Sequence, residues 1–363
     1  MKVSIGTKLK KGPYGGGNQF AIALCRHLER RQVEVSFDLN DPDLDVILLT
    51  EPRAGRPISA FSDRDVLRYL LGKNRRVIVV HRINDSDESR GTLGVNRRLM
   101  RANRVGDHTV WVSEWLKDLF AQQGFGLGPS TVIRNGSDRS LFHSRGFHRW
   151  DRCGPLRLVT HHWSTNGMKG FDLYPRLDDW VATGPFAGEI SFTYIGRLPE
   201  APRLRNTVHA GVLHGEGLAD ALRDHHLYVT AALNEAGANH PNEGACCGLP
   251  LLYRESGCLP EYCQGYGLSF TAEDLEQKLQ EMMDRYEGWA DRMPEYPHSS
   301  ERMGEEYLAL FERLLDERTR ILERRELRRD PVLLFQAFLP ELPFQRTAAS
   351  VLEWLRKSRG SSP

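Results

Sequence analysis

The sequence predicts an α/β protein of two Rossmann-like domains, each a doubly wound parallel sheet, followed by a helical segment. Short apolar runs of strand length alternate with helical patterns along most of the chain, which indicates parallel sheets built from right-handed crossovers. The alternation pauses at residues 143–155, a stretch rich in glycine, arginine and histidine that lacks hydrophobic periodicity. At 363 residues, the chain has the length of two domains with a terminal extension.

The first predicted domain, residues 1–148, alternates strands with helices from its start. Strands are expected at residues 2–6, 33–37, 45–50, 77–80, 109–113 and 131–133. Helices are expected near residues 18–28, 66–71, 95–102 and 115–123, where apolar residues recur at helical spacing. Asn18 is expected to cap the first helix and Gly72 to end the second, and the strand at 77–80 is expected to end at His81.

The second predicted domain, residues 149–300, resumes the alternation after the linker. Strands are expected at residues 156–160, 192–195, 227–231, 250–253 and 268–270. The third part, residues 301–363, is expected to be helical. Its charges alternate in sign over residues 312–330, which is typical of a solvated helix laced with ion pairs, or of a basic edge that meets an anionic acceptor or a membrane surface. Pro331 is expected to end that helix, and a short final helix contains Trp354.

The composition excludes several functional classes. Lysines and arginines number 49 against 48 aspartates and glutamates, so no bulk charge attracts nucleic acid. The longest apolar runs are far shorter than the roughly 18 residues of a membrane span, and the amino terminus lacks the apolar segment of a secretory signal. We therefore expect a cytoplasmic protein. The cysteines lack the spacing of a zinc site and are expected to be reduced thiols: Cys25, Cys153, Cys246, Cys247, Cys258 and Cys263.

A run of three glycines, Gly15, Gly16 and Gly17, lies between the first strand and the first helix. Glycine lets the backbone approach a ligand closely, and a helix N-terminus offers free N–H groups to an anion. The run is neither a dinucleotide fingerprint, whose third glycine is replaced by Phe20, nor a P-loop, because no Gly-Lys-Ser/Thr ending follows. Two interpretations stay open: a loop that faces phosphate or sugar, and a tight turn with no ligand.

Two glutamates, Glu235 and Glu243, follow the apolar strand at 227–231. Pro241 suits the first turn of a helix, which places Glu243 in that turn and Glu235 in the preceding loop, at the carboxyl edge of the sheet where such sheets bind ligands. Small residues at 236–238 keep the loop backbone accessible. Two carboxylates here can accept hydrogen bonds from vicinal hydroxyls, one set on a sugar and one on a ribose. The alternative is a capping acid and an unrelated surface acid.

The motifs around these glutamates occur in an order that resembles glycosyltransferase family four. The glutamates are eight positions apart, and Cys-Gly-Leu-Pro and Gly-Cys-Leu-Pro-Glu follow them at 247–250 and 257–261. The glycine run, Asn-Gly-Ser-Asp at 135–138 and Lys-Gly at 169–170 complete the pattern, which spans roughly residues 3–275. This family contains retaining, nucleotide-sugar-dependent transferases with the GT-B fold, in which two Rossmann-like domains face each other across a cleft. The resemblance implies that fold here, with the helical carboxyl-terminal segment packed back on the first domain.

The resemblance also implies roles for individual residues. Glu235 would contact hydroxyls of the transferred sugar, Glu243 would hold the ribose, and Lys169 would neutralise the departing diphosphate. His81 would lie near the primary hydroxyl of the sugar; alternatively, it is a strand-end histidine that the backbone satisfies. Together the implied donor-binding residues are Gly16, Gly17, Ser164, Gly237, Ala238, Asn239, His240 and Glu243.

One position departs from the family pattern. The family usually has an arginine about five residues before the lysine, and Ser164 occupies that place. The loss of a guanidinium removes a bidentate phosphate contact. His162, Arg197 or a basic group from the other domain could replace it.

The implied reaction is transfer of a sugar from a nucleotide diphosphate to a hydroxyl acceptor (a glycan, a lipid-linked molecule or a small molecule), as in polysaccharide biosynthesis. The nucleotide sugar is a co-substrate, so no cofactor is expected. Asp-x-Asp sequences at 41–43 and 85–87 spell a metal-binding signature of a different glycosyltransferase fold, but we expect a turn and a polar loop there, and no metal. The alternatives are a nucleotide-sugar epimerase of the same fold and a non-catalytic nucleotide-sugar-binding protein.

Overall fold

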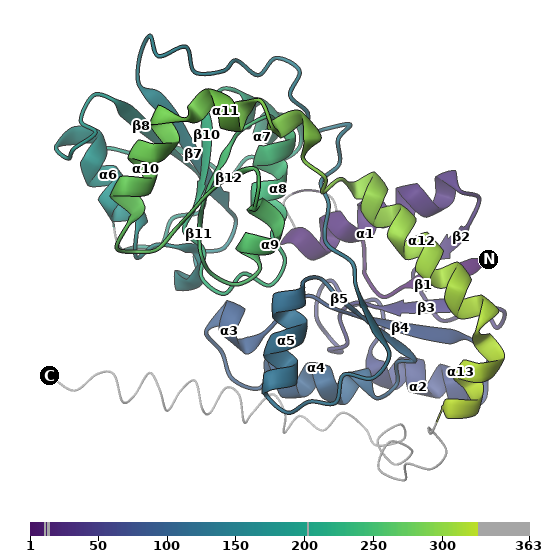
Figure 1. Ribbon diagram of the computed structural model, residues 1–363. Coiled ribbons are helices and arrows are strands. Elements are labelled where there is room, and N and C mark those ends of the chain that lie inside the picture. The colour runs from purple at the N-terminus through teal and green to yellow at the C-terminus, as the bar shows by residue number, and fades with distance from the viewer. Residues whose placement is uncertain (11, 13–14, 202, 326–363) are drawn as a thin grey trace, which may run out of the picture.

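Two parallel sheets, each covered by helices on both faces, form the computed structural model of the chain (Figure 1). It describes residues 1–10, 12, 15–201 and 203–325. Within these residues each sheet has six strands, in the orders β2-β1-β3-β4-β5-β6 and β12-β11-β10-β7-β8-β9. Every strand pair is parallel. The two sheets confirm the predicted pair of doubly wound domains.

The first sheet and its helices occupy the chain up to Val132. Its strands are β1 (Lys2–Ile5), β2 (Glu34–Ser36), β3 (Val46–Leu49), β4 (Ile78–Ile83), β5 (His108–Trp111) and β6 (Ser130–Val132). The helices between them are α1 (Gly15–Arg30), α2 (Asp63–Gly72), α3 (Asp87–Arg90), α4 (Val95–Asn103) and α5 (Glu114–Gln122).

The second sheet begins after a stretch, residues 133–155, that contains neither helix nor strand. Its strands are β7 (Leu156–His162), β8 (Ile190–Gly196), β9 (Val208–Gly211), β10 (Leu227–Thr230), β11 (Leu251–Arg254) and β12 (Gly267–Phe270). The helical elements among and after them are η1 (Gly167–Lys169), α6 (Tyr174–Ala182), α7 (Glu216–Arg223), α8 (Asn239–Cys246), α9 (Leu259–Cys263), α10 (Leu275–Asp284), α11 (Tyr286–Ala290) and η2 (Met293–Glu295). The chain returns to the first domain with α12 (Ser300–Asp316) and α13 (Arg318–Arg324).

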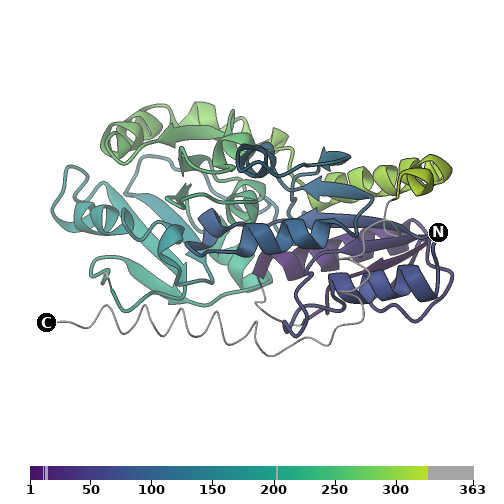
Figure 2. The same cartoon turned by 90° about the horizontal axis from the view of Figure 1, so that it is seen from below.

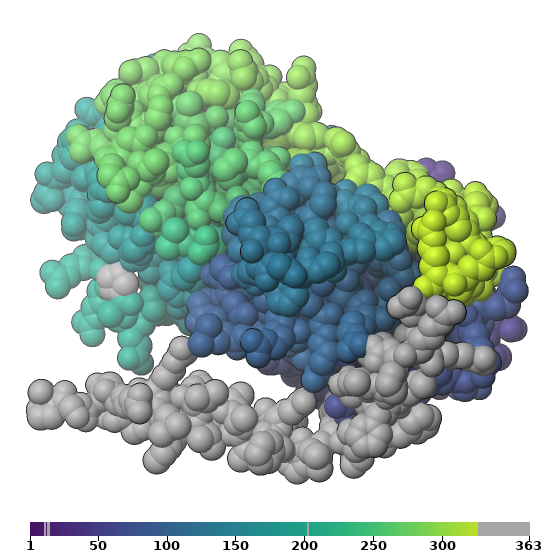
Figure 3. Space-filling view, turned by 60° about the horizontal axis from the view of Figure 1, so that its bottom comes forward, coloured from purple at the N-terminus to yellow at the C-terminus, as the bar shows by residue number. Residues whose placement is uncertain are grey.

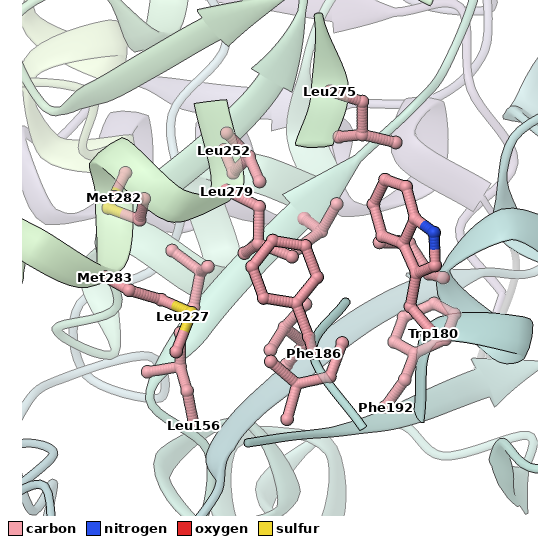
Figure 4. Packing of buried hydrophobic residues seen from close by; sticks show 14 of the residues in the cluster. Leu156, Trp180, Phe186, Phe192, Leu227, Leu252, Leu275, Leu279, Met282 and Met283 are labelled. Carbon is pink, nitrogen blue, oxygen red and sulfur yellow. The ribbon is translucent and has the colours of Figure 1, made fainter. Parts of the chain in front are cut away.

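Alternation along the buried strands explains why both faces of each sheet are covered. In β3, Val46 and Leu48 pack with α1 and α12 on one face, whereas Ile47 and Leu49 pack with α2 on the other. The second sheet is similar, and the cluster on one of its faces joins its strands to α6 and α10 (Figure 4). Labelled members of that cluster include Leu227, Trp180 and Met282.

Helix α12 packs on the first domain rather than on the second, from which the chain arrives (Figures 1 and 2). Its residues Tyr307 and Phe311 are fully buried, and the ring of Tyr307 lies 5.3 Å from that of Phe20 in α1. The segment expected as one helix over 312–330 is divided, because α12 ends at Asp316 and α13 follows. The expectations for Pro331 and Trp354 lie outside the described residues.

The chain crosses between the domains twice, and the two crossings are hydrogen-bonded to each other. The N–H of Ser137 donates to the carbonyl of His298 at 3.1 Å, and the N–H of Ser300 donates to the carbonyl of Ser137 at 2.9 Å. A Cβ at Gly136 would lie 2.0 Å from the carbonyl oxygen of Ser299, so only glycine permits this approach. The predicted Asn-Gly-Ser-Asp motif is therefore part of the connection between the domains.

Three local expectations are wrong, and one strand was not expected. Helix α1 begins at Gly15, three residues before its expected cap, and Asn18 instead binds the backbone N–H and carbonyl of Lys10, both at 2.9 Å. Gly72 is the last residue of α2 rather than the residue that follows it. Strand β4 continues past His81 to Ile83, which pairs with Trp111 of β5. Strand β9 was not predicted, because its residues form an exposed edge without an apolar run.

Several histidines are buried as neutral groups, which predicts acid sensitivity. Burial lowers the pKa of His81, His108, His226 and His298 to about 4. An unfolded chain binds protons at histidine near pH 6.5, so between pH 6.5 and 4 it binds more protons than the folded protein. As the pH is lowered from 6.5 to 4, the free energy of unfolding should therefore decrease, by up to about 1.4 kcal/mol per pH unit for each such histidine.

Urea unfolding at several pH values from 7 to 4 measures this slope. The variant His298→Phe keeps a ring against Tyr262 and Tyr296 but cannot bind a proton. Its slope should be shallower than that of the wild type. An equal slope in the two proteins would show that His298 does not contribute.

Candidate active site between the domains

A cavity of about 420 Å³ lies where the carboxyl ends of the strands of both sheets meet. The first domain contributes the glycine run and the residues that follow β3 and β4, such as Glu51 and Asp85. The second domain contributes the residues that follow β7 and β10, such as Ser164 and Glu235. The edge of an open parallel sheet beyond its carboxyl ends is the usual ligand-binding position, so the cavity is the candidate site.

The domains are also in contact beside the cavity, where α5 in blue lies against the green surface of the second domain (Figure 3). The carboxylate of Glu261 accepts the backbone N–H groups of Glu114 and Trp115, at 2.9 and 2.5 Å. It also pairs with Arg134 at 3.2 Å. Glu261, the last residue of the Gly-Cys-Leu-Pro-Glu motif, thus caps a helix of the other domain and stabilises the interface.

An ion pair between Lys169 and Glu235 lies at the wall of the cavity, with Nζ and a carboxylate oxygen 2.5 Å apart. Lys169 ends the short helix η1, and the next residue, Gly170, has φ +92° and packs against Ala231 so closely that a Cβ would lie 2.6 Å from it. This glycine brings η1 beside the end of β10. The structure therefore places both predicted residues together.

The loop that carries Glu235 is held from behind by residues 256–258. The carbonyl of Glu235 accepts the N–H of Cys258 at 2.8 Å, and the N–H of Asn234 donates to Oγ of Ser256 at 2.9 Å. Gly257, at φ +61°, passes so near that a Cβ would lie 2.3 Å from the backbone nitrogen of Glu235. The Gly-Cys-Leu-Pro-Glu motif thus begins with a backbone support that fixes the Glu235 carboxylate in the cavity.

Glu243 also lines the cavity, but another side chain already engages one of its oxygens. Nε2 of His161 donates to this oxygen at 2.7 Å, since a carboxylate can only accept. Nδ1 of His161 lies 3.0 Å from the hydroxyl of Tyr228. The helix begins at Asn239, so Glu243 lies in its second turn and not, as expected, in its first. The His161 bond orients the carboxylate and leaves its other oxygen for a ligand.

His162 and His240 line the same cavity as neutral groups. Their rings are 4.6 Å apart; Nε2 of His162 lies 2.8 Å from the hydroxyl of Tyr174, and Nε2 of His240 lies 2.9 Å from that of Thr230. Burial, assisted by the charge of Lys169, holds the pKa of both rings well below its usual value. His162 therefore cannot supply the positive charge for which it was considered.

Of three other predicted residues, two lie outside the lining of the cavity and one is part of it. His81 is fully buried within β4, its Nδ1 lies 2.9 Å from Oδ1 of Asn103, and it does not line the described cavity. Its predicted contact with sugar is therefore not possible in this structure, because the strand continues beyond it. Arg197 is exposed, and it too is absent from the lining. Ser164 lines the cavity as expected.

The predicted backbone positions of the donor site come together at the junction of two helix N-termini. Gly16 and Gly17 are in the first turn of α1, and Asn239 and His240 are in the first turn of α8. A Cβ at Gly16 would lie 1.9 Å from the Asn239 amide, so the two helix ends are in contact across the cavity. Gly237 lines the cavity beside them, whereas Ala238 is fully buried behind it.

Among known proteins, only solved structures match the chain; no family model and no curated protein does. Sucrose-phosphate synthase from Thermosynechococcus elongatus is similar, with a TM-score of 0.58 and 11% identity over 87% of this chain and 99% of that one. So is HepE from Anabaena in complex with UDP, with a TM-score of 0.61 and 13% identity over 86% and 100%. The pneumococcal O-GlcNAc transferase GtfA, in complex with UDP and GlcNAc, has a TM-score of 0.56 and 14% identity over 76% and 59%.

These similarities extend over both sheets and over the gap between them. The chain has the GT-B fold. At 11–14% identity, these similarities show the fold alone, and the chemistry depends on the residues in the GT-B cleft.

The first domain of this GT-B chain contributes charged residues that the sequence analysis did not assign to the site. Glu51 accepts from the guanidinium of Arg53 through both oxygens, at 2.7 and 2.6 Å, and Asp85 accepts from Arg90 at 2.6 Å. All four line the cavity. Glu51 and Asp85 follow the buried strands β3 and β4 within two residues, so polar residues directly after an apolar run were the available signal. Arg82, near the end of β4, lines the same wall.

The residues of the two Asp-x-Asp sequences have structural partners. Asp41 pairs with Lys2 at 2.8 Å and caps the turn at Asp43. The carboxylate of Asp87 accepts the backbone N–H groups of residues 94–96, which anchors the start of α4. Within the part of the chain that the structure describes, no three histidine, cysteine or acidic side chains gather as metal ligands. In the same part, no helix combines the length and hydropathy of a membrane crossing.

The described cysteines contribute no second site. All six are free thiols, and Cys246, Cys247, Cys258 and Cys263 belong to the packing around α8 and α9. Burial raises the pKa of the Cys25 and Cys246 thiols to about 11, so they stay protonated at neutral pH.

Proposed function

We propose that this protein is a retaining glycosyltransferase that moves a sugar from a nucleotide diphosphate to a hydroxyl acceptor in the GT-B cleft. The observation that carries the proposal is the convergence of Lys169, Glu235 and Glu243 on one cavity, in the positions that the sequence pattern implied. Further support comes from the described neighbours HepE and GtfA, which were solved in complex with UDP.

The second domain would hold the donor. The free oxygen of Glu243 would accept hydrogen bonds from ribose hydroxyls, and Glu235 would accept from hydroxyls of the transferred sugar. Lys169 has three N–H donors, of which Glu235 occupies one, so the others could reach the diphosphate. A second cavity of about 260 Å³, which shares Trp163 and Glu243 with the first, would take the nucleoside.

The proposed reaction exchanges one bond at the anomeric carbon for another. The bond from that carbon to the β-phosphate oxygen breaks, its electron pair stays with the diphosphate, and a bond to the acceptor oxygen forms on the same face. The acceptor proton passes to the departing phosphate, which needs no carboxylate base. Lys169 and the N–H groups at the helix N-termini would stabilise the charge that develops on the leaving group.

The proposal needs no resident cofactor and assigns the leaving-group charge to the protein's own cations rather than to a metal ion. The acceptor would enter along the first domain, beside Glu51 and Asp85. Closure of the domains about the two hydrogen-bonded crossings would exclude water, which limits hydrolysis of the donor.

Calorimetric titration with UDP, GDP, ADP and the free nucleosides tests donor binding. One diphosphate should bind at least tenfold more tightly than its own nucleoside, and the corresponding nucleotide sugar should be turned over with an acceptor panel. Without acceptor, slow release of sugar with its configuration retained is expected, whereas an isomerised nucleotide sugar would indicate an epimerase. Binding without turnover of any kind would indicate a non-catalytic binding protein, and absence of nucleotide binding would contradict the proposal.

A further inference from the structure

The guanidinium of Arg82 is buried at the cavity without a carboxylate partner. Only 2% of the residue is exposed, yet it contributes to the cavity lining. Nη2 donates to Oδ1 of Asn135 at 2.9 Å, and the guanidinium carbon lies 3.8 Å from the centre of the Phe20 ring. Nε is buried without a hydrogen-bond partner, and another polar group that faces the guanidinium is the neutral hydroxyl of Tyr307. No described acidic side chain forms an ion pair with this residue.

Other buried or half-buried arginines of the first domain and of the carboxyl-terminal segment packed on it have the usual compensation. Arg53 pairs with Glu51, Arg98 pairs with Asp63 at 2.7 Å, and Arg325 pairs with Asp107 through Nε at 2.8 Å. A buried charge without a partner costs several kcal/mol, and burial accordingly lowers the pKa of Arg82. An anion that enters the cavity would remove this cost.

The surroundings of Arg82 strengthen the case for an anion. Phe20, which its guanidinium covers, lies in the second turn of α1, whose first turn presents the free N–H groups of Gly16 and Gly17 at the same cavity. A helix N-terminus beside an unpaired cation is unfavourable unless both face a negative group. The Asn135 amide, which holds Arg82, also touches Gly237: a Cβ there would lie 2.7 Å from Nδ2. Arg82 is thus connected to the loop of Glu235 through one side chain.

We propose that Arg82 contacts a substrate phosphate, next to the N-terminus of α1 that the proposed function already directs at the leaving group. This inference rests on the proposed function and extends it, since it makes both domains, and not only the second, hold the charged part of a substrate. The phosphate belongs either to the diphosphate of the donor or to a phosphorylated acceptor. In both cases the contact couples domain closure to the presence of substrate, because the anion joins Arg82 to the groups of the second domain.

The test compares Arg82→Met with Arg82→Lys and with the matched control Arg325→Met, which removes a buried arginine that does have a partner. Without ligand, Arg82→Met should be as stable as the wild type or more stable, because an uncompensated charge is removed. Arg325→Met should be less stable, because Asp107 loses its partner. Thermal unfolding measures both effects. A large loss of stability in Arg82→Met alone would overturn the view that its charge is uncompensated.

Ligand binding then distinguishes the sources of phosphate. If the donor supplies it, the affinity ratio of UDP to uridine should fall roughly 10- to 100-fold in Arg82→Met, less in Arg82→Lys, and not at all in Arg325→Met. If the acceptor supplies it, that ratio should be unchanged, but thermal stabilisation of UDP-saturated protein by inorganic phosphate should disappear in Arg82→Met. If Arg82→Met changes neither the affinity ratio of UDP to uridine nor the thermal stabilisation by inorganic phosphate, the inference is overturned.

The failure of the proposed function would look different. In that case the wild type would bind neither UDP nor another nucleoside diphosphate better than the nucleoside. Inorganic phosphate added to the free protein would then still test Arg82, because its stabilising effect should be present in the wild type and absent in Arg82→Met.

Discussion

Replacing Lys169 with alanine should lower kcat by about 10³-fold while the fold stays intact. The amine is the nearest described cation to the Glu235 carboxylate, and in the proposed reaction it stabilises the negative charge that grows on the diphosphate. Removal of a single preorganised donor from a developing anion costs about 10²- to 10³-fold in kcat, and a full positive charge should cost at least as much. The lysine and Glu235 side chains are only 21% and 12% exposed, so the loss of their ion pair should lower the free energy of unfolding. Both face the cavity, where water can solvate Glu235, and the protein should stay folded.

Steady-state kinetics with saturating donor measure the loss, and circular dichroism checks the fold. A matched control is Lys278→Ala on α10, which removes a lysine of similar exposure that pairs with Glu281 outside the cavity. This control should retain wild-type kcat. Comparable activity in Lys169→Ala and Lys278→Ala would show that leaving-group stabilisation lies elsewhere.

The architecture was largely predictable from the sequence because it depends on short-range patterns. Buried parallel strands such as β3, and the first three residues of β4, are continuous apolar runs, because both of their faces are covered by helices. Errors concern the ends of elements. His81 follows four apolar residues and looks like a strand end, but the buried pairing of Ile83 with Trp111 extends the strand.

The second-domain half of the site was predictable for a related reason: its residues are sequential in one loop and one helix. Four of its residues lie within nine positions of the chain: Glu235, Asn239, His240 and Glu243. Their relative positions in space therefore follow from the spacing of these residues along the sequence. The first-domain half was not predictable. Arg82 occurs within a strand, where a charged residue would ordinarily reach solvent, and its burial depends on Phe20 and Asn135 from distant parts of the chain. Such long-range packing leaves no periodic signal.

The contact between Glu243 and His161 illustrates the same limit. The sequence predicted a carboxylate free to bind ribose, but His161, 82 positions earlier, occupies one of its oxygens. The pairing does not remove the predicted role. It fixes the direction of the carboxylate and so reduces the entropy that ribose binding would otherwise cost.

Replacing Glu235 with glutamine should separate sugar transfer from nucleotide binding. Glutamine keeps the size of the side chain but loses the charge, so hydroxyls of the transferred sugar lose an acceptor and Lys169 loses its ion pair. We expect kcat to fall about 10²- to 10³-fold, as for other charged contacts made in the transition state. The affinity for UDP, which has no sugar to contact Glu235, should be unchanged or higher, because Lys169 becomes free to bind phosphate with all its donors.

Calorimetry with UDP and kinetics with the nucleotide sugar, performed on one preparation, measure the two effects. Glu255→Gln is a suitable control, since Glu255 is an exposed acid close to the same loop and does not line the cavity. A parallel loss of UDP affinity and kcat in Glu235→Gln would mean that Glu235 holds the nucleotide or the loop rather than the sugar. Lowered kcat with retained UDP affinity would instead place the transferred sugar between Glu235 and the first domain, where the acceptor must approach it.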